Sequence, residues 1–367
     1  MKNSFGNSIC ITLFGESHGE QIGAVLDGLA PGIPVCEDHI RHALSLRRPS
    51  GNLSTQRQEK DEFSIVSGVF RGKTTGAPIT VLIKNTEKNS ADYELGERLA
   101  RPSHADYTAS VKYHGYEDYR GGGHFSGRLT APLVALGAIV KDALAQKGIF
   151  LGTHITALGD TVDRPFENTR ADIEALNEMT FPVLAPEAKK KMTAYIEDAA
   201  REGDSVGGIL ESAVLGVPAG VGEPFFDSVE SMLSHALFSI PAVKGVSFGA
   251  GFDFARMHGS EANDAFRNEN GKVVTETNHN GGILGGITTG MPILFRTAIK
   301  PTPSIYKEQK TVSISNGENA VLKVHGRHDP CIVHRARAVV DAIAALTLAD
   351  LLALRYGTDY LLPEKDN

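Results

Sequence analysis

Two histidines in this sequence stand in short polar segments where acid–base chemistry could take place. His18 lies in residues 15–19 (GESHG), a polar turn between two candidate strands, and His104 follows a Pro-Ser pair in residues 101–107 (RPSHADY). Imidazole is the side chain that gains and loses a proton near neutral pH. A lone histidine is more often structural than catalytic, so each segment alone gives only a weak prediction.

Basic residues gather at several places, although the chain as a whole is acidic. The formal net charge is -7, from 37 Lys plus Arg and 44 Asp plus Glu, which argues against general binding to nucleic acid or to a membrane surface. The local basic residues are Arg41, Arg47, Arg48, Arg57, Lys60, Arg101, Lys300, Arg327, Arg335 and Arg337. Because a guanidinium forms two parallel hydrogen bonds with a carboxylate or phosphate, these residues predict a pocket for a small polyanion.

Three glycine clusters lie beside such residues. Residues 68–74 (GVFRGKT) are one residue short of a phosphate-binding P-loop and precede an apparent strand, so we expect a turn between strands there. Residues 121–123 (GGG) lack the spacing of a dinucleotide fingerprint but precede a helix, where backbone amides can approach an anion. Together with residues 281–286 (GGILGG), the clusters suggest a ligand held close to the backbone.

Several classes of site are not supported. Neither histidine has the spacing of a metal site, and HExxH is absent, so we expect no metal. Cys10, Cys36 and Cys331 are scattered without a CxxC pair, which favours reduced thiols in the cytosol. No Gly-x-Ser-x-Gly elbow supports a hydrolase. The N-terminus lacks the apolar core of a signal peptide, and we find no uninterrupted apolar run of membrane-spanning length. We therefore expect a cytoplasmic protein.

The elements that must position these residues follow from hydrophobic periodicity. Strands are predicted at 8–14, 22–27, 63–70, 78–84, 150–158, 207–217, 244–249, 283–299 and 311–315. Helices are predicted at 37–47, at 130–147, twice within 170–200, up to Leu237, and at 332–354. Because strands and helices do not alternate regularly, the order favours an α+β fold with antiparallel or mixed sheets over a doubly wound parallel sheet. No linker divides the chain, so residues 1–367 are predicted to form a single domain.

Some helix boundaries have specific chemical signals. Thr130 is a candidate cap for the helix at 130–147, which Gly148 would end. Residues 227–230 (DSVE) are a candidate capping box for the helix that runs to Leu237. The run Lys189-Lys190-Lys191 is expected to be the solvated face of a helix.

These segments, in this order, resemble the chorismate synthase family from about Ile9 to Leu352. The matching segments are GESHG (15–19) with Asp27-Gly28 and Pro31-Gly32, RRP (47–49), RPSHADY (101–107), DYRGGG (118–123), KPTPS (300–304) and GRHDPC (326–331). Each motif is short, but the ordered set is highly specific.

The resemblance implies a function and a fold. Family members are lyases that convert 5-enolpyruvylshikimate 3-phosphate to chorismate by 1,4-elimination of phosphate, the last step of the shikimate pathway. They require reduced FMN, although the net reaction is redox-neutral, and the family is associated with NADP. The implied fold is a β-α-β sandwich of mostly antiparallel sheets around helices, and the implied assembly is a homotetramer. Because no reductase domain is visible, we expect an external flavin reductase or another source of reduced flavin.

The resemblance also implies roles for individual residues. His18 would protonate the reduced flavin, His104 would assist the departure of phosphate, and Asp329 would help the flavin N5 remove the ring proton. The residues implied for substrate binding are Arg47, Arg48, Arg128 and Arg335. The residues implied for the cofactor are His124, Phe125, Ser126, Ala242, Gly285, Lys300, Pro301, Thr302, Pro303, Ser304 and Arg327.

One stretch departs from the family pattern. The family usually has GRSSARET where this chain has GHFSGRLT at 123–130, so His124, Phe125 and Leu129 replace Arg, Ser and Glu. Smaller departures are Leu53, where many relatives have a basic residue, and Pro241, where Asn is common. These changes keep open a flavin-binding paralogue that acts on a related polyanionic acid. A third alternative is a polyanion-binding or regulatory module without enzyme activity.

Overall fold

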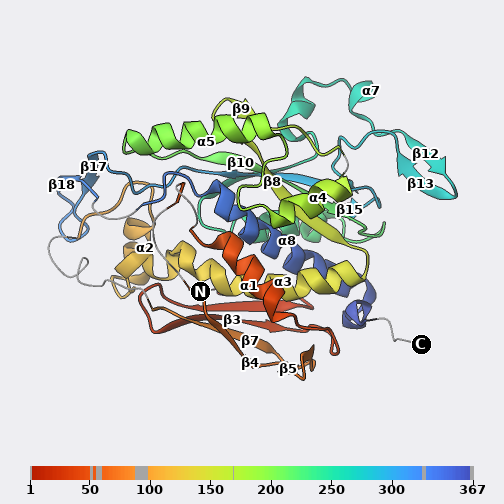
Figure 1. The fold of residues 1–367 in the computed structure, drawn as a ribbon, viewed down its shortest axis with the longest axis horizontal. Coiled ribbons are helices and arrows are strands. Elements are labelled where there is room, and N and C mark those ends of the chain that lie inside the picture. The colour runs from red at the N-terminus through yellow and green to blue at the C-terminus, as the bar shows by residue number, and fades with distance from the viewer. Residues whose placement is uncertain are drawn as a thin grey trace.

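Two five-stranded antiparallel sheets enclose a layer of helices in this computed structural model (Figure 1). The structure describes residues 2–49, 53–54, 60–86, 98–167, 169–324 and 328–363. The first sheet has the order β1 (Ser4–Phe5), β2 (Cys10–Gly15), β3 (Gln21–Asp27), β7 (Ile79–Lys84) and β4 (Phe63–Ser67). The second has the order β11 (Val243–Phe248), β16 (Ile293–Ile299), β10 (Gly208–Leu215), β8 (Phe150–Leu158) and β9 (Thr161–Val162). The predicted α+β sandwich is confirmed.

The middle layer consists of α1 (Glu37–Arg47), α3 (Thr130–Gln146) and α8 (Val333–Tyr356). α3 contacts β3, β7 and β8, and α8 contacts β8 and β10, so this layer packs against both sheets. Both helices are therefore apolar around most of their circumference. They cross closely at Gly137, where a Cβ atom would stand 2.4 Å from the Cβ of Ala342.

Residues Gly127–Gln146, which include α3, have the length and composition of a membrane-spanning helix, with a mean hydropathy of 1.3. This segment is not an uninterrupted apolar run, since Lys141 and Asp142 lie within it, so the expectation that no such run reaches membrane-spanning length is not contradicted. Its most apolar 18-residue window is 72% buried within the protein. It serves here as a core helix between the two sheets (Figure 1).

The remaining elements lie outside this sandwich. α4 (Thr169–Glu178) packs against β8, and α5 (Pro186–Arg201) contacts β9. α2 (Asp106–Tyr113) begins directly after His104 and Ala105, and α6 (Val229–Leu237) packs against α8 and β11. Four hairpins complete the fold: β5 (Val69–Phe70) with β6 (Lys73–Thr74), β12 (Phe266–Glu269) with β13 (Lys272–Thr275), β14 (Ile283–Leu284) with β15 (Ile287–Thr288), and β17 (Gln309–Val312) with β18 (Asn319–Leu322). Figure 1 shows β12, β13 and α7 (Gly259–Ala262) projecting from the layered body.

Several local predictions are confirmed and others are wrong. The turn predicted in place of a P-loop is present, since Arg71 and Gly72 join β5 to β6 with positive φ. The Lys189-Lys190-Lys191 run is exposed on α5, as expected. The strand predicted at 63–70 is interrupted at Gly68, which has a φ of 82°. α2 was not predicted from the sequence, because it lacks an apolar face: Ala109 is the one buried residue among its eight.

Both predicted helix caps are corrected. Thr130 is the first residue of α3, and its hydroxyl donates to the carbonyl of Gly127. A 3-10 turn (Gly127–Leu129) precedes it, and Ser126 caps that turn by accepting from the backbone N–H of Arg128. For α6 the cap is Ser228 in place of Asp227, because the Ser228 hydroxyl accepts from the N–H of Ser231. A short 3-10 turn precedes each helix. The backbone N–H groups that need a capping acceptor therefore lie at other positions than those predicted from the sequence.

A buried polar cluster ties β8 to its neighbours. The His154 ring, which is fully buried, lies 2.8 Å from Asp163 and 3.2 Å from Glu211. Asp163 also accepts from the backbone N–H groups of Leu184 and Ala185, just before α5, and Glu211 binds Arg296 on β16. Burial by itself lowers the pKa of His154, but the two carboxylates outweigh it and raise the pKa above its usual value.

This shift predicts how stability depends on alkaline pH. A histidine whose pKa is raised on folding contributes stability below its unfolded pKa, and that contribution is lost as pH rises through the folded value. The free energy of unfolding should therefore fall as pH rises above about 6.5, and His154→Gln should reduce this slope. Urea unfolding between pH 6 and 9 would measure it. If the free energy of unfolding changed with pH equally in wild type and in His154→Gln, the prediction would be wrong. The control is His258→Gln, which replaces an exposed histidine.

Candidate active site

The turn that carries His18 is held on three sides. The N–H of Ser17 donates to the carbonyl of Gly123 at 3.1 Å. The Nδ1 atom of His124 lies 2.8 Å from the carbonyl oxygen of Gly15. The side-chain amide of Asn85, just after β7, donates to the carbonyls of Glu16 and Gly19 at 3.0 and 3.1 Å. These bonds fix the backbone on both sides of the buried His18 ring.

The glycine run of residues 121–123 lies against both histidines. All three glycines have positive φ. A Cβ atom on Gly121 would stand 2.5 Å from the Nε2 atom of His18, and one on Gly122 would stand 3.4 Å from the Nε2 atom of His104. His18 and His104, 86 positions apart in the chain, are thus brought to one turn. The glycines are needed here to admit the two rings, a reason that the sequence analysis did not foresee.

His104 belongs to a compact charged group at the start of α2. Its Nδ1 atom lies 2.7 Å from Asp106, and Arg101 forms a two-point ion pair with the same carboxylate. Burial by itself raises the pKa of Asp106, but hydrogen bonds from Arg101 and His104 outweigh it and hold the pKa below its usual value. When Nδ1 of His104 carries a proton, it donates a hydrogen bond to Asp106. The other ring nitrogen, Nε2, lies near Gly122 and is then the atom that can exchange a proton with a ligand.

The arginines predicted to bind substrate form a second group beside this turn. Asp61 accepts from Arg47 at 3.2 Å with one carboxylate oxygen and is paired with Arg128 through the other. Arg128 also donates from Nε to Asn85 at 3.1 Å, and Asn85 supports the His18 turn. One chain of contacts therefore links both arginines to the segment that positions His18.

Asp329 and Arg335 continue this group on the side of α8. Arg335 donates from Nε to the carbonyl of Arg47 at 2.8 Å, and its Nη1 atom pairs with the carboxylate of Asp329. Arg48 donates to the carbonyl of Lys60 at 3.1 Å. The predicted residues Arg47, Arg48, Arg335 and Asp329 thus lie together where the end of α1 meets the start of α8.

Residues 300–304, predicted to bind the cofactor, are anchored through their backbone and through Lys300. The N–H of Lys300 donates to the carbonyl of Ala242 at 2.9 Å, and its ammonium group donates to the carbonyl of Ser103 in the His104 loop. Burial, followed by the charge of Lys244, lowers the pKa of Lys300. Ser205 donates to the carbonyl of Thr302 at 2.7 Å. The structure therefore places Ala242 and residues 300–304 near the predicted catalytic loop.

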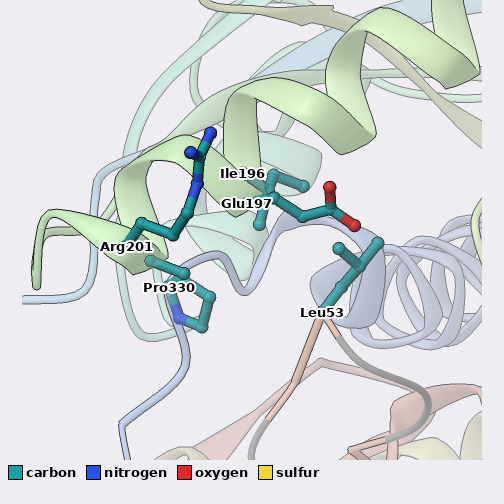
Figure 2. Close-up of a pocket in the computed structure, with 6 residues that line it drawn as sticks. Leu53, Ile196, Glu197, Arg201 and Pro330 are labelled. Atoms are coloured by element: carbon teal, nitrogen blue, oxygen red, sulfur yellow. The ribbon is translucent and has the colours of Figure 1, made fainter.

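A hollow of about 330 Å³ opens between α5 and the segment that contains Asp329 (Figure 2). Its lining residues are Leu53, Ile196, Glu197, Ala200, Arg201 and Pro330. A smaller hollow, which shares Ala200 and Pro330 with it, is lined by Asp329, Ser304 and Tyr306 among others. The last turns of α5 thus form an outer wall beside Asp329. This wall was not predicted from the sequence, because α5 carries no chemical motif.

The remaining predicted cofactor residues are not all brought together. Gly285 lies in the turn between β14 and β15. Gly281, just before this hairpin, accepts from the N–H of Leu294 near the start of β16, whereas Lys300 follows the last residue of β16. Seven residues of strand span about 20 Å, so the hairpin that carries Gly285 is anchored near the end of β16 that lies away from Lys300. Phe125 packs edge-on against Tyr113 and is about one-third exposed. Arg327, like Arg57, lies outside the described residues.

Three residues with a clear place in this geometry had no predicted role. Asp106 lies in the RPSHADY segment, two positions after His104. Its position so close to a histidine, at the start of a helix, was the available signal for its role. Asn85 and Asp61 gave no signal in the sequence, since their partners are 43 and 67 positions away along the chain. Their roles depend on how β7 and α1 pack beside the turn at residues 121–129.

Comparison with known proteins identifies the family of this chain. The sequence profile of the chorismate synthase family matches residues 9–353. The chain is 48% identical over 349 residues to chorismate synthase of Korarchaeum cryptofilum, which covers 94% of this chain and 96% of the relative. It is also 48% identical to chorismate synthase of Thermococcus gammatolerans, over 95% of this chain and 97% of the relative. A crystal structure of chorismate synthase superposes with a TM-score of 0.75 at 29% identity, over 96% of this chain and 94% of that one. The chain therefore belongs to the chorismate synthase family.

Proposed function

We propose that this chain carries out the chorismate synthase reaction with His18, His104 and Asp329 as its catalytic residues and with reduced FMN as its cofactor. The family reaction (EC 4.2.3.5) converts 5-enolpyruvylshikimate 3-phosphate to chorismate and phosphate, within aromatic amino acid biosynthesis. The observation that best supports these roles is the convergence of both imidazoles on the glycine turn at residues 121–123.

The residues proposed to hold the flavin fit such a ligand. Among the residues that the structure describes, Thr302 has a buried hydroxyl oxygen without a hydrogen-bond partner. Buried polar atoms are normally satisfied, so this hydroxyl suits a polar group of a bound molecule. Lys300 and Ser304 flank it, and Arg327, His124, Phe125 and Ser126 complete the proposed contacts. When bound, the reduced flavin supplies electron density to the substrate transiently and recovers it, so that no net hydride transfer occurs.

The histidines supply protons at defined atoms. The Nε2 atom of His104 is proposed to deliver a proton to the oxygen of the departing phosphate, while Asp106 stabilises the charged ring and fixes its orientation. The Nε2 atom of His18 is proposed to hold the proton that the reduced flavin requires. Its ring is fixed against Gly121, so the proton is kept at one place in the site.

The arginines and Asp329 hold and act on the substrate. The substrate carries two carboxylates and a phosphate, and guanidinium groups match both kinds of anion. Arg47, Arg48, Arg128 and Arg335 are proposed to bind these groups. Arg335 also holds the carboxylate of Asp329 in place, and Asp329 is proposed to assist removal of the ring proton.

The proposed setting is a single domain of residues 1–367 in a cytoplasmic homotetramer supplied with reduced flavin by an external reductase, with NADP as the associated redox cofactor. The shared helical layer supports the single domain, since α3 contacts both sheets and also packs against α8, which contacts the second sheet. Phe225, Phe226 and Phe252 are 85%, 91% and 89% exposed, and contact with other copies would cover such surfaces.

The proposed ternary complex gives a direct test. Purified protein with substrate and reduced FMN, without oxygen, is expected to release phosphate and form chorismate. Substrate should tighten the binding of reduced FMN by roughly 5- to 150-fold, the usual range of coupling between sites. Anaerobic fluorescence titration would measure the affinity, and Lys190→Ala, on the exposed face of α5, is the control.

A second candidate function is a flavin-binding paralogue that acts on a related polyanionic acid. The observation that favours it is the change at residues 124–125. His124 now bonds to the carbonyl of Gly15, and Phe125 packs against Tyr113. Flavin binding that substrate does not tighten, together with no chorismate, would support the paralogue and contradict the synthase proposal.

A further inference from the structure

Asp61 joins two arginines that come from different parts of the chain. Its Oδ2 atom accepts from Nη2 of Arg47 at 3.2 Å, and its Oδ1 atom pairs with Nη1 of Arg128. The carboxylate side chain is fully buried, and the side chains of Arg47 and Arg128 are only 5% and 11% exposed. One carboxylate therefore bridges the last turn of α1 and the 3-10 turn that precedes α3.

Each guanidinium has further anchors that fix its plane. Arg47 donates to the carbonyl of Gly127 at 3.5 Å. Arg128 donates from Nε to Asn85 at 3.1 Å and from Nη2 to the carbonyl of Lys84 at 3.2 Å. A guanidinium is planar and has five N–H donors, so contacts at several of them set its orientation. The contact to Asp61 joins the two guanidiniums directly through one carboxylate.

The backbone of Asp61 points to the same role. Its φ is 48°, in the left-handed region that few residues other than glycine adopt. Such conformations persist where surrounding contacts determine them, and they are frequent at functional sites. Here the conformation directs the carboxylate between the two arginines.

Charge explains why a carboxylate is needed between them. Two guanidiniums held close together without an anion repel each other, and the repulsion is strong in a buried site. Asp61 offsets one of the two positive charges through an ion pair with each guanidinium.

We infer that Asp61 is a positioning residue of the synthase: it holds Arg47 and Arg128 at a fixed separation and orientation, so that together they bind the anionic groups of the substrate. This inference rests on the proposed role of these arginines in substrate binding. It adds a residue that acts on the substrate only through them.

The substitution Asp61→Asn separates this role from simple filling of space. Asparagine has nearly the same shape, but one of its two oxygens becomes an NH₂ group. That group would present hydrogens to a guanidinium that also presents hydrogens, so one arginine would be released. Asp61→Glu keeps the charge and moves it by one methylene group, which displaces both arginines.

The test is anaerobic steady-state kinetics at fixed ionic strength, with thermal unfolding measured on the same samples. Asp61→Asn is expected to raise the KM for substrate at least tenfold, with a smaller fall in kcat. The matched control is Asp172→Asn on α4, another buried aspartate that binds an arginine, Arg164, at 2.6 and 3.1 Å. It should lose thermal stability to a similar degree while its KM stays within twofold of wild type.

Each outcome decides the inference. A folded Asp61→Asn protein with a KM within twofold of wild type would overturn it, as would an Asp172→Asn protein whose KM rises equally. If Asp61→Asn does not fold, Asp61→Glu is measured in its place. Its KM must then be at least threefold above that of wild type, and a smaller rise would overturn the inference. Wild-type turnover tests the proposed function separately, because a protein that forms no chorismate fails before any variant is compared.

Discussion

Replacing His104 with alanine is expected to lower kcat by about 10²- to 10⁴-fold, the usual contribution of a general acid. The departing phosphate would then have to be protonated by water. His104 is held by Asp106 at 2.7 Å and lies against Gly122, so its removal takes away a proton donor whose position is fixed. Anaerobic chorismate formation at saturating substrate and reduced FMN would measure the loss.

The partner variant Asp106→Asn shows whether orientation matters. The amide keeps the shape of the carboxylate but no longer stabilises a positively charged ring, so kcat should fall while FMN binding is retained. The pKa of Asp106 is lowered, so its carboxylate is charged and stabilises the His104 ring at any pH above the usual value of 3.8. This stabilisation is lost only as pH falls below 3.8. The Asp106 charge itself should therefore produce no step in the wild-type rate between pH 6 and 9.

The control for this pair is His114→Ala, at the other end of α2, where the residue ends the helix. That variant should keep its kcat within about twofold of wild type. If His104→Ala retained more than a tenth of the wild-type kcat, His104 would not be the proton donor, and the role proposed for it would be wrong.

Replacing Asp350 with alanine is expected to lower the free energy of unfolding by about 3–5 kcal/mol. Asp350 lies on α8 and is 1% exposed. Its carboxylate accepts from the backbone N–H groups of Asn7, Ser8 and Ile9 at 3.0, 2.7 and 2.8 Å. These bonds tie the segment between β1 and β2 to the central helix. Alanine would leave the three N–H groups without their acceptor.

Urea unfolding followed by circular dichroism would measure this change. Asp350→Asn should cost less, because the amide oxygen can still accept from part of the segment. The exposed Asp359→Ala is the control and should change the free energy of unfolding by at most about 0.5 kcal/mol. A loss below about 1 kcal/mol for Asp350→Ala would show that other contacts hold the N-terminal segment.

Much of the fold could be predicted because its signals are local. The apolar face of residues 37–47, with Pro49 after it, matches the bounds of α1. The long apolar segments that became α3 and α8 were found for the same reason, as was the glycine at 148 that follows α3. The ordered motifs also sufficed to identify the family, because so many short segments in one order seldom arise independently.

Elements without such signals were missed or misplaced. The β12–β13 hairpin has almost no buried residues, so its sequence lacks the alternation that indicates a strand. Short 3-10 turns precede α3 and α6, so the capping side chains are Ser126, which caps the turn before α3, and Ser228, which caps α6. Such turns depend on how the preceding chain packs.

The sequence by itself determined which residues have the chemistry for this site: His18, His104 and the arginines, each read from its own segment. Only the tertiary structure decided which of them meet. Packing of the first sheet and of α1 against α3 brings the His18 turn to Gly121 and brings Asp61 between Arg47 and Arg128. Hydrophobic periodicity and turn chemistry report on neighbours within a few residues, whereas these contacts join segments 14 to 103 positions apart.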